Sequence, residues 1–215
     1  MAAACGRDLV WDARSLDGMS SKLILASASP QRRALLGALG LDFEIEDHSI
    51  EELREGDPRE LVVENARWKA ASVASHARPG TLVIAGDTEV VFESKVLGQP
   101  ADEAEARSHL ERLSGAEHEV LGGLAVLRAA GDARSGVEAT TVRFRELDPA
   151  LVEAYLASGE WRGRAGSYAI QGLGSALVDR VRGDVSNVIG LPVGLLLRLA
   201  PELAATRPHR SERGA

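Results

Sequence analysis

Two long stretches in the middle of the chain alternate between apolar and polar residues, and they constrain the fold more than any other feature. They span residues 119–128 and 136–145, and the turn residues Gly131 and Asp132 lie between them. A period of two is typical of a strand with one buried face, and two such stretches around a turn predict an antiparallel pair. The middle of the chain therefore forms part of a β-sheet.

Short strands and helices precede this pair. Apolar runs predict buried strands at Leu23–Ala26 and in "TLVIAGD", which ends in a glycine and an acid, and residues 43–46 alternate like a further strand. Ser29 with Pro30, and Asp57 with Pro58, mark helix starts, because Ser and Asp cap helices and proline suits the first helical position. Further expected elements are a hairpin over 89–97, helices over 101–113, 149–157 and 192–203, and a strand over 175–181.

The order of these elements predicts the fold class. Strands separated by helices, followed by antiparallel strands, favour an α/β protein with a mixed sheet and helices packed on it. A length of 215 residues, 45% of them hydrophobic, suits one globular domain or two small lobes that share a core. We expect this domain to span 21–204, with a disordered extension over 1–20 and a polar tail over 205–215. Ligands of such sheets tend to bind beyond the carboxyl ends of strands.

Composition and charge argue against several function classes. The formal net charge of −7 argues against a nucleic-acid partner, because such proteins usually present a basic face. Aromatic residues, at 4%, are too few for a surface that stacks single strands. No apolar run approaches the roughly 20 residues of a membrane span. The lone Cys5 can form no internal disulfide, and we therefore expect a cytoplasmic protein without a membrane partner.

The helix start in "LILASASPQRRALLGALG" is the first candidate site. With Ser29 as cap and Pro30 at the first helical position, free N–H groups point outward, and such helix starts bind anions. Arg32 falls on the same helix face as the buried leucines, whereas Arg33 points away. Arg32 therefore binds a phosphate or a buried carboxylate, and a structural ion pair is the alternative. Ser27 either donates to a phosphate or caps a turn.

The strand end in "VIAGDTEVV" is the second candidate site. A carboxylate at Asp87 can orient a water, accept its proton or hold a divalent cation, although an ordinary turn aspartate is the alternative. Lys69 lies at the flank of its helix's apolar stripe, so its amine either reaches inward or extends to solvent. Glu51 and Glu52 in "SIEE" either bind a metal or belong to a solvated loop, and the sequence alone favours the loop.

The third candidate site is a glycine-rich stretch, "AGSYAIQGLGSALV". Its glycines let a ligand approach the backbone, and the amide of Gln171 has the paired donor and acceptor that can read a base edge. The stretch lacks the Gly-Lys-Ser/Thr of a phosphate-binding loop and the Gly-x-Ser-x-Gly of a hydrolase elbow. By itself it does not define an activity.

Together these stretches resemble the Maf family, also called septum-formation proteins, which are nucleoside triphosphate pyrophosphatases. The similar segments lie in family order between residues 22 and 203 and read "LASASPQRR", "ARWKA", "VIAGDT", "VLGQPADEAEA", "LSGAEHEV", "GRAGSYAIQGLGSALV" and "NVIGLPV". The resemblance implies an inosine-triphosphatase-like (Ham1-like) α/β fold, with an elongated mixed sheet and a cleft between two lobes. It also implies hydrolysis between the α- and β-phosphates with a divalent cation, Mg²⁺ or Mn²⁺, in a cytoplasmic homodimer that clears unwanted nucleotides.

The resemblance also implies roles for individual residues. Asp87 would act as proton acceptor and metal ligand, and Glu51 would help to hold the metal or the water. Ser27 and Arg32 would hold phosphates, and Lys69 would contact the triphosphate. These roles describe a hydrolase that acts on acid anhydrides.

Base selection is implied at Gln31, Thr88 and Gln171. The subfamily that acts on dTTP and UTP is the most similar, and CTP or modified pyrimidine nucleotides are further candidates. Its members commonly have arginine at the position of Gln31, and the 7-methyl-GTP subfamily, an alternative, has tryptophan there. The chain also has Gln99 where the family usually has lysine. Either Lys95 supplies the missing charge, or the protein is a nucleotide-binding regulator with weak catalysis.

Overall fold

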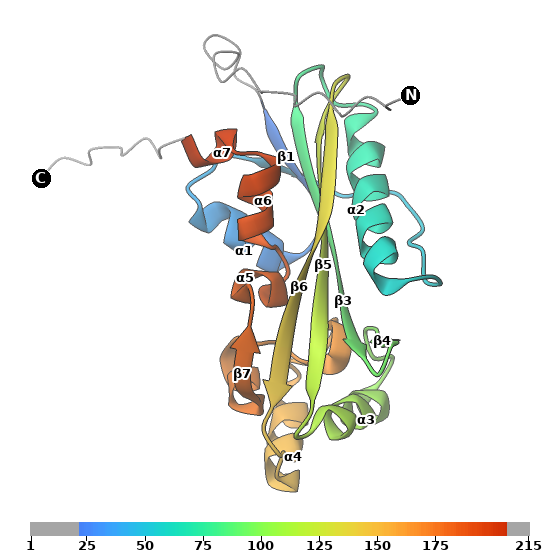
Figure 1. Cartoon of the computed structure of the whole chain (residues 1–215), viewed down its shortest axis with the longest axis vertical. Coiled ribbons are helices and arrows are strands. Elements are labelled where there is room, and N and C mark those ends of the chain that lie inside the picture. Colours follow the sequence, from blue (N-terminus) through green and yellow to red (C-terminus); the bar gives the residue numbers. More distant parts are fainter. Residues whose placement is uncertain (1–21, 206–215) are drawn as a thin grey trace, which may run out of the picture.

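One mixed β-sheet runs the length of the molecule, as Figure 1 shows for the computed structural model, which describes residues 22–205. The strand order is β2-β1-β3-β5-β6-β7, with β4 paired to β3. β1 runs parallel to β2 and β3, and the other pairs are antiparallel. The strands are β1 Leu23–Ala26, β2 Glu44–Glu46, β3 Leu82–Phe92, β4 Lys95–Leu97, β5 Glu117–Arg128, β6 Ala133–Phe144 and β7 Val178–Arg182. The predicted α/β class with an elongated mixed sheet is confirmed.

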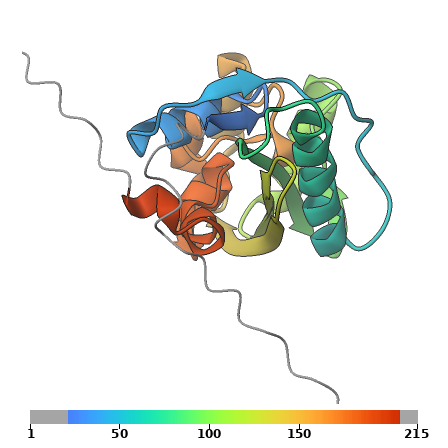
Figure 2. The ribbon, with the colours of Figure 1, turned by 90° about the horizontal axis from the view of Figure 1, so that it is seen from above.

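Helices cover both faces of one half of the sheet and gather at the end of the other half (Figures 1 and 2). Helix α2 lies on one face, and α1, α6 and α7 lie on the opposite face, while α3 and α4 lie at the far end. The helices are α1 Pro30–Ala38, α2 Pro58–Ala74, α3 Glu103–Leu113, α4 Pro149–Ser158, α5 Val185–Ile189, α6 Val193–Leu199 and α7 Glu202–Ala205. None of these helices is long and apolar enough to cross a membrane.

The hydrophobic core has separate parts in the two halves, which form the two lobes that the family resemblance implied. In the half that carries α2, Val83 and Ala85 pack toward α2, while Ile84 packs with Leu36 and Leu196 on the other face. A third cluster fills the opposite half, and its largest fully buried members are Tyr155 and Phe144. The long strands β3, β5 and β6 run through both lobes and join them.

Strand β3 has an open edge where the lobes meet. β1 pairs with β3 only as far as Ile84, and β4 pairs with β3 only from Val90 onward. Within the described part of the chain, no strand pairs with that edge between these two residues. On its other edge β3 pairs with β5 continuously, from Leu82 to Val91. The prediction that the strand ends at Asp87 is therefore wrong, because pairing with β5 and then with β4 keeps β3 extended to Phe92 and leaves Asp87 inside the strand.

Two adjacent glycines of β5 allow helices to approach the sheet closely at this level. A Cβ on Gly123 would lie 1.9 Å from the carbonyl oxygen of Val62 in α2, and one on Gly122 would lie 1.8 Å from Oδ1 of Asn187 in α5. Gly123 is the register partner of Asp87. The glycine pair therefore brings α2 and α5 against the sheet beside the residue that the sequence singled out.

Some predicted boundaries differ from the structure. The helix predicted over 192–203 is divided into α6 and α7 at Pro201, which lacks the N–H that a continuous helix needs. The strand predicted over 175–181 begins only at Val178, because residues 172–177 form a 3₁₀ helix, and the helix predicted over 101–113 begins after its cap at Asp102. Helix α5 was not predicted. The extension predicted over 1–20 and the tail predicted over 205–215 lie outside the described residues, except for Ala205.

Candidate active site

A cavity of about 730 Å³ opens at the unpaired edge of β3. Its volume is within the range of small-molecule sites, roughly 300–1,000 Å³. Both lobes contribute to its walls, and the main lining segments are 27–32, 52–54, 87–90, 163–165 and 188–190, together with Lys69 and Gln99. The cavity lies beyond the carboxyl end of β1, whose termination leaves the edge of β3 open, and this is where the sequence predicted a ligand site.

The start of α1 forms one wall, and its cap and first helical residue are the predicted ones. Ser29 caps the helix through its hydroxyl, which accepts from the backbone N–H of Arg32 at 3.4 Å, and Pro30 is the first helical residue. The hydroxyl of Ser27 in turn accepts from the backbone N–H of Ser29 at 3.2 Å. The side chains of Ser27 and Arg32 are both brought to the cavity, whereas Arg33 is exposed and does not line it.

Uncharged acceptors hold the guanidinium of Arg32. It donates through Nε to the carbonyl of Gly190 at 2.8 Å, and through its two terminal nitrogens to Ser27 Oγ at 3.3 Å and Thr88 Oγ1 at 3.0 Å. Burial lowers the pKa of Arg32, and the more distant carboxylates of Asp87 and Glu52 oppose that shift. Because no carboxylate of residues 22–205 forms a direct ion pair with it, Arg32 keeps its charge for an anionic ligand. The alternative of a structural ion pair is not observed.

Asp87 faces α2 and is held through both carboxylate oxygens. Lys69 Nζ lies 2.7 Å from Oδ1, and Asn65 Nδ2 donates to Oδ2 at 3.1 Å. Asp87 is 7% exposed and Lys69 is 3% exposed, so Lys69 reaches inward rather than to solvent. An ion pair this deep needs good geometry to offset desolvation, and the contact with Asn65 supplies part of it. The result is a carboxylate of fixed orientation at the edge of the cavity.

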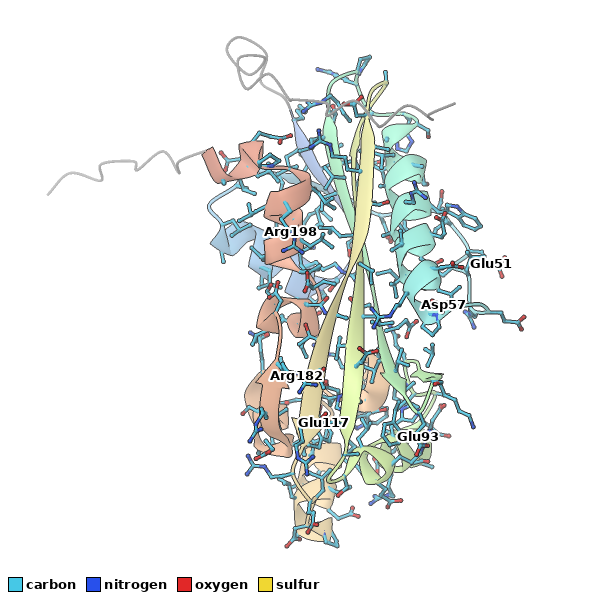
Figure 3. All side chains as sticks on the ribbon, viewed as in Figure 1. Glu51, Asp57, Glu93, Glu117, Arg182 and Arg198 are labelled. Carbon is cyan, nitrogen blue, oxygen red and sulfur yellow. The ribbon has the colours of Figure 1, made fainter. Side chains whose placement is uncertain are left out.

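The structure places Glu52, rather than Glu51, in the site. Glu52 lines the cavity, and its Oε1 lies 2.6 Å from Lys69 Nζ. Glu51 is exposed, does not line the cavity and lies away from the sheet in Figure 3. The amide of Asn65 fixes this loop, because it accepts from the N–H of Leu53 at 2.8 Å and donates to the carbonyl of Leu53 at 3.1 Å. The candidate at Glu51 is therefore corrected to its neighbour.

Sequence reasoning missed Glu89. It follows Asp87 by two positions on β3, so both side chains lie on the same face of the strand. Glu89 lines the cavity, and its Oε2 is buried without a hydrogen-bond partner among the described residues. Burial raises the pKa of Glu89 to about 7, and the neighbouring carboxylates of Asp87 and Glu52 add to the shift. The spacing of the two acids in "DTE" would place them on one face of a continuous strand. Because the strand was predicted to end at Asp87, Glu89 was not recognised as a site residue.

The predicted base-selecting residues are divided between two connected cavities. A smaller cavity of about 260 Å³ is lined by Gln31 and Gln171, so the structure brings these two side chains together. Gln31, Arg164 and Tyr168 line both cavities, which are therefore contiguous. Thr88 lines only the larger one, where it accepts the hydrogen bond from Arg32. The larger cavity, which holds Arg32, suits the anionic end of a ligand, and the smaller one has room for its other end.

Gln99, which replaces the usual lysine, and Lys95, which could supply its charge, differ in their position relative to the larger cavity. Gln99 is exposed and lines the larger cavity, whereas Lys95 is exposed on the hairpin and does not line it. The suggestion that Lys95 supplies the missing charge therefore gains no support from its position.

Comparison with known proteins shows which proteins this chain resembles. Residues 22–203 match the family described as Maf-like protein. A dTTP/UTP pyrophosphatase of Deinococcus radiodurans is 46% identical over 179 residues, which cover 83% of this chain and 91% of that protein. A dTTP/UTP pyrophosphatase of Pyrococcus abyssi is 42% identical over 190 residues, which cover 87% of this chain and 100% of that protein. Among solved structures, the Ham1 protein of Staphylococcus aureus aligns with a TM-score of 0.43 and 14% identity, over 57% of this chain and 71% of that chain.

Proposed function

We propose that this chain, because it belongs to the Maf-like protein family, hydrolyses dTTP and UTP to the nucleoside monophosphate and pyrophosphate. One observation carries the proposal. A single cavity holds a cation with uncharged partners, Arg32, and a carboxylate of fixed orientation, Asp87. The relatives named dTTP/UTP pyrophosphatase support the choice of substrate. CTP and modified pyrimidine nucleotides are further candidate substrates.

The phosphates bind at the start of α1. There the first turn of the helix, the hydroxyl of Ser27 and the guanidinium of Arg32 line the cavity. Helix starts favour anions, and a guanidinium donates two parallel bonds to phosphate oxygens. Arg32 can give up its bonds to the two hydroxyls while Nε keeps its bond to the carbonyl of Gly190. The triphosphate is thereby positioned along the open edge of β3.

Asp87 accepts the proton of the attacking water. The oxygen of this water bonds to the α-phosphorus and pyrophosphate leaves, so that one bond forms, one breaks and the carboxylate takes the released proton. Lys69 and Asn65 hold the carboxylate in place, and Lys69 also holds Glu52 at the wall. An immobile base costs little reorganisation during the reaction.

The residues present fit a divalent cation, Mg²⁺ or Mn²⁺, that is shared with the substrate. No group of three His, Cys, Asp or Glu side chains within residues 22–205 could hold a metal without other ligands. Mg²⁺ is usually bound by one or two carboxylates together with phosphate oxygens and water. Asp87 and Glu89, which lie two positions apart on β3 and of which Glu89 has an unpartnered Oε2, would supply two carboxylates. When bound, the cation offsets the negative charge of the phosphates.

The base lies in the smaller cavity between Gln31 and Gln171. An amide offers a donor beside an acceptor, and the Watson–Crick edge of a pyrimidine such as thymine or uracil carries both. A purine base such as 7-methylguanine is the alternative occupant of this cavity.

The test is pyrophosphate release by the purified protein with Mg²⁺ or Mn²⁺ and a panel of dTTP, UTP, CTP and 7-methyl-GTP. We expect the fastest release from dTTP and UTP, with loss of activity in Asp87→Asn and full activity in the control Asp42→Asn, which changes an exposed residue outside the cavity. A rate that is highest for 7-methyl-GTP would contradict the substrate assignment. Tight dTTP binding without release at any metal concentration would instead favour a nucleotide-binding regulator.

Gln99 is the feature that favours this second candidate, since a glutamine cannot supply the charge of the usual lysine. If that charge limits the rate, Gln99→Lys increases turnover. Unchanged turnover would remove the reason for considering the regulator.

The homodimer and the cytoplasmic location belong to the same proposal. Size-exclusion chromatography with light scattering tests the first, because a dimer has twice the mass of the 22.8-kDa chain. Fractionation of cells that express the full chain tests the second.

A further inference from the structure

The side chain of Arg164 lies where the two cavities meet. It lines both the larger cavity, which holds Asp87 and Arg32, and the smaller one, which holds Gln31 and Gln171. A ligand with its base in the smaller cavity and its phosphates in the larger one must pass this point. No role was predicted for Arg164 from the sequence.

The backbone around Arg164 is fixed on both sides. Its N–H donates to the carbonyl of Trp161 at 3.2 Å, and its carbonyl accepts from the N–H of Ser167 at 3.0 Å. The N–H of Gly166 donates to the carbonyl of Gly98 at 3.1 Å, and so ties this segment to the residue before Gln99. Arg164 and Gln99 consequently belong to segments that touch, at the same wall of the larger cavity.

The guanidinium of Arg164 has no protein acceptor. Its Nε is buried without a hydrogen-bond partner, and its side chain forms no ion pair or hydrogen bond within the described part of the chain. Glu160 shares the smaller cavity, but its two oxygens accept from the backbone N–H groups of Leu173 at 3.0 Å and Gly174 at 3.1 Å. The residue as a whole is half-buried, but its buried Nε–H lacks a partner, which is costly, so an acceptor that arrives with a ligand best explains this arrangement.

The chemistry of that acceptor follows from the other charges in the cavity. Lys69 is already paired with Asp87 and Glu52, and Gln99 carries no charge. Arg32 and Arg164 approach the cavity from opposite lobes as cations without a carboxylate partner, and the exposed Arg54 is a further cation at its wall. A guanidinium presents a planar fork that matches two phosphate oxygens, which makes it a stronger phosphate ligand than an amide.

We propose that Arg164 binds the phosphate chain of the substrate next to the nucleoside, and so supplies the positive charge that Gln99 lacks. This inference rests on the proposed function, because it requires a nucleoside triphosphate in the cavity. Arg164 touches the substrate directly and is not a base-selecting residue.

Calorimetric binding of a non-hydrolysable dTTP analogue, with a methylene group between the α- and β-phosphates, tests the proposal in the presence of Mg²⁺. We expect Arg164→Gln to weaken binding of the analogue at least ten-fold and to leave binding of thymidine, which has no phosphate, unchanged. Arg164→Lys keeps the positive charge but loses the planar guanidinium, so its affinity for the analogue should lie between that of the wild type and that of Arg164→Gln. The matched control is Arg162→Gln, because Arg162 is exposed, stacks on Trp161 with 4.7 Å from its guanidinium carbon to the ring centroid, and lines neither cavity.

A second arm tests the link to Gln99. In the Arg164→Gln background, adding Gln99→Lys should restore part of the lost affinity for the analogue, since it returns one cation to the same wall. Equal unfolding midpoints for all variants exclude a general loss of structure.

Three outcomes would overturn the inference. Equal affinity of Arg164→Gln and Arg162→Gln for the analogue would do so while leaving the proposed function intact. A parallel loss of thymidine and analogue binding would assign Arg164 to the base or to the structure of the wall. A wild-type protein that binds no nucleotide would overturn both the inference and the proposed function.

Discussion

Replacing Gly123 with alanine should separate α2 from the sheet and weaken both folding and catalysis. A Cβ at this position would lie 1.9 Å from the carbonyl oxygen of Val62, 2.2 Å from its carbonyl carbon and 2.8 Å from the backbone nitrogen of Val63. Ordinary contacts of a Cβ begin at 3.4 Å, and the obstructing atoms are helix backbone, which no side-chain rotation can move aside. The helix must therefore retreat by about 1.5 Å in a close-packed interior.

The magnitude follows from what that movement breaks. Overpacking of a core costs about 1–3 kcal/mol. The same shift draws Asn65 and Lys69 of α2 away from Asp87, and hydrogen bonds to a charged group contribute about 1.5–3 kcal/mol each. We expect the free energy of unfolding to fall by about 3 kcal/mol or more. A misplacement of about 1 Å in a catalytic group can cost a hundred-fold in rate, so kcat/KM for dTTP should fall to a similar extent.

Urea unfolding and steady-state pyrophosphate release measure the two effects. Gly37→Ala is the matched control, because Gly37 lies inside α1 and a Cβ there would meet no atom within 4 Å. Replacing a helical glycine with alanine should stabilise the protein by about 0.5–1 kcal/mol. If Gly123→Ala unfolds within about 0.5 kcal/mol of the wild type, a typical effect of a neutral surface change, the close approach of α2 is not what holds the site together.

Three further variants test other parts of the structure. Lys69→Met should lower the free energy of unfolding by about 3–5 kcal/mol, because it leaves Asp87 buried without its cation, and adding Asp87→Asn should restore part of the loss in the same denaturation assay. Burial lowers the pKa of His118 from 6.5 to about 4. As the pH is lowered from about 6.5 to about 4, the unfolded chain binds a proton before the folded protein does, so the free energy of unfolding decreases by about 3 kcal/mol over this interval. In His118→Phe this decrease should be absent, and an identical pH dependence of the free energy of unfolding in the two proteins would refute the role of His118. Glu160→Gln should speed hydrogen exchange at the amide of Leu173, which donates to Glu160 at 3.0 Å, and an unchanged exchange rate would show that this bond does not hold the loop.

Local signals predicted most of the elements. Ser29, Asp57 and Asp148 each cap a helix in the structure, and each is followed by a proline at the first helical position. The alternating stretch over 119–128 lies within β5, the stretch over 136–145 lies within β6 except for Arg145, and the two strands pair antiparallel. These elements depend on caps, turn residues and hydrophobic period, which act over a few residues and can be recognised without knowing the neighbours.

Errors occurred where the outcome depends on contacts distant in sequence. The predicted end of the strand at Asp87 was wrong because pairing with β5 continues to Val91, whose partner Glu119 lies 28 residues later in the chain. The same error hid Glu89. The choice between Glu51 and Glu52 depended on Asn65, whose amide fixes the loop from α2.

The sequence by itself determined the order of the elements, the helix starts, the mixed sheet and, through the family resemblance, Ser27, Arg32, Lys69 and Asp87 as members of one site. Tertiary structure decided how these residues meet. The glycines of β5 set the distance of α2 from the sheet, the early end of β1 opened the edge of β3, and the segment after α4 brought Arg164 to the junction of the cavities. The physical reason is the distance along the sequence over which the interactions act. Caps and periodicity act within a few residues, whereas the depth of a cavity and the partner of a buried charge depend on how distant segments pack.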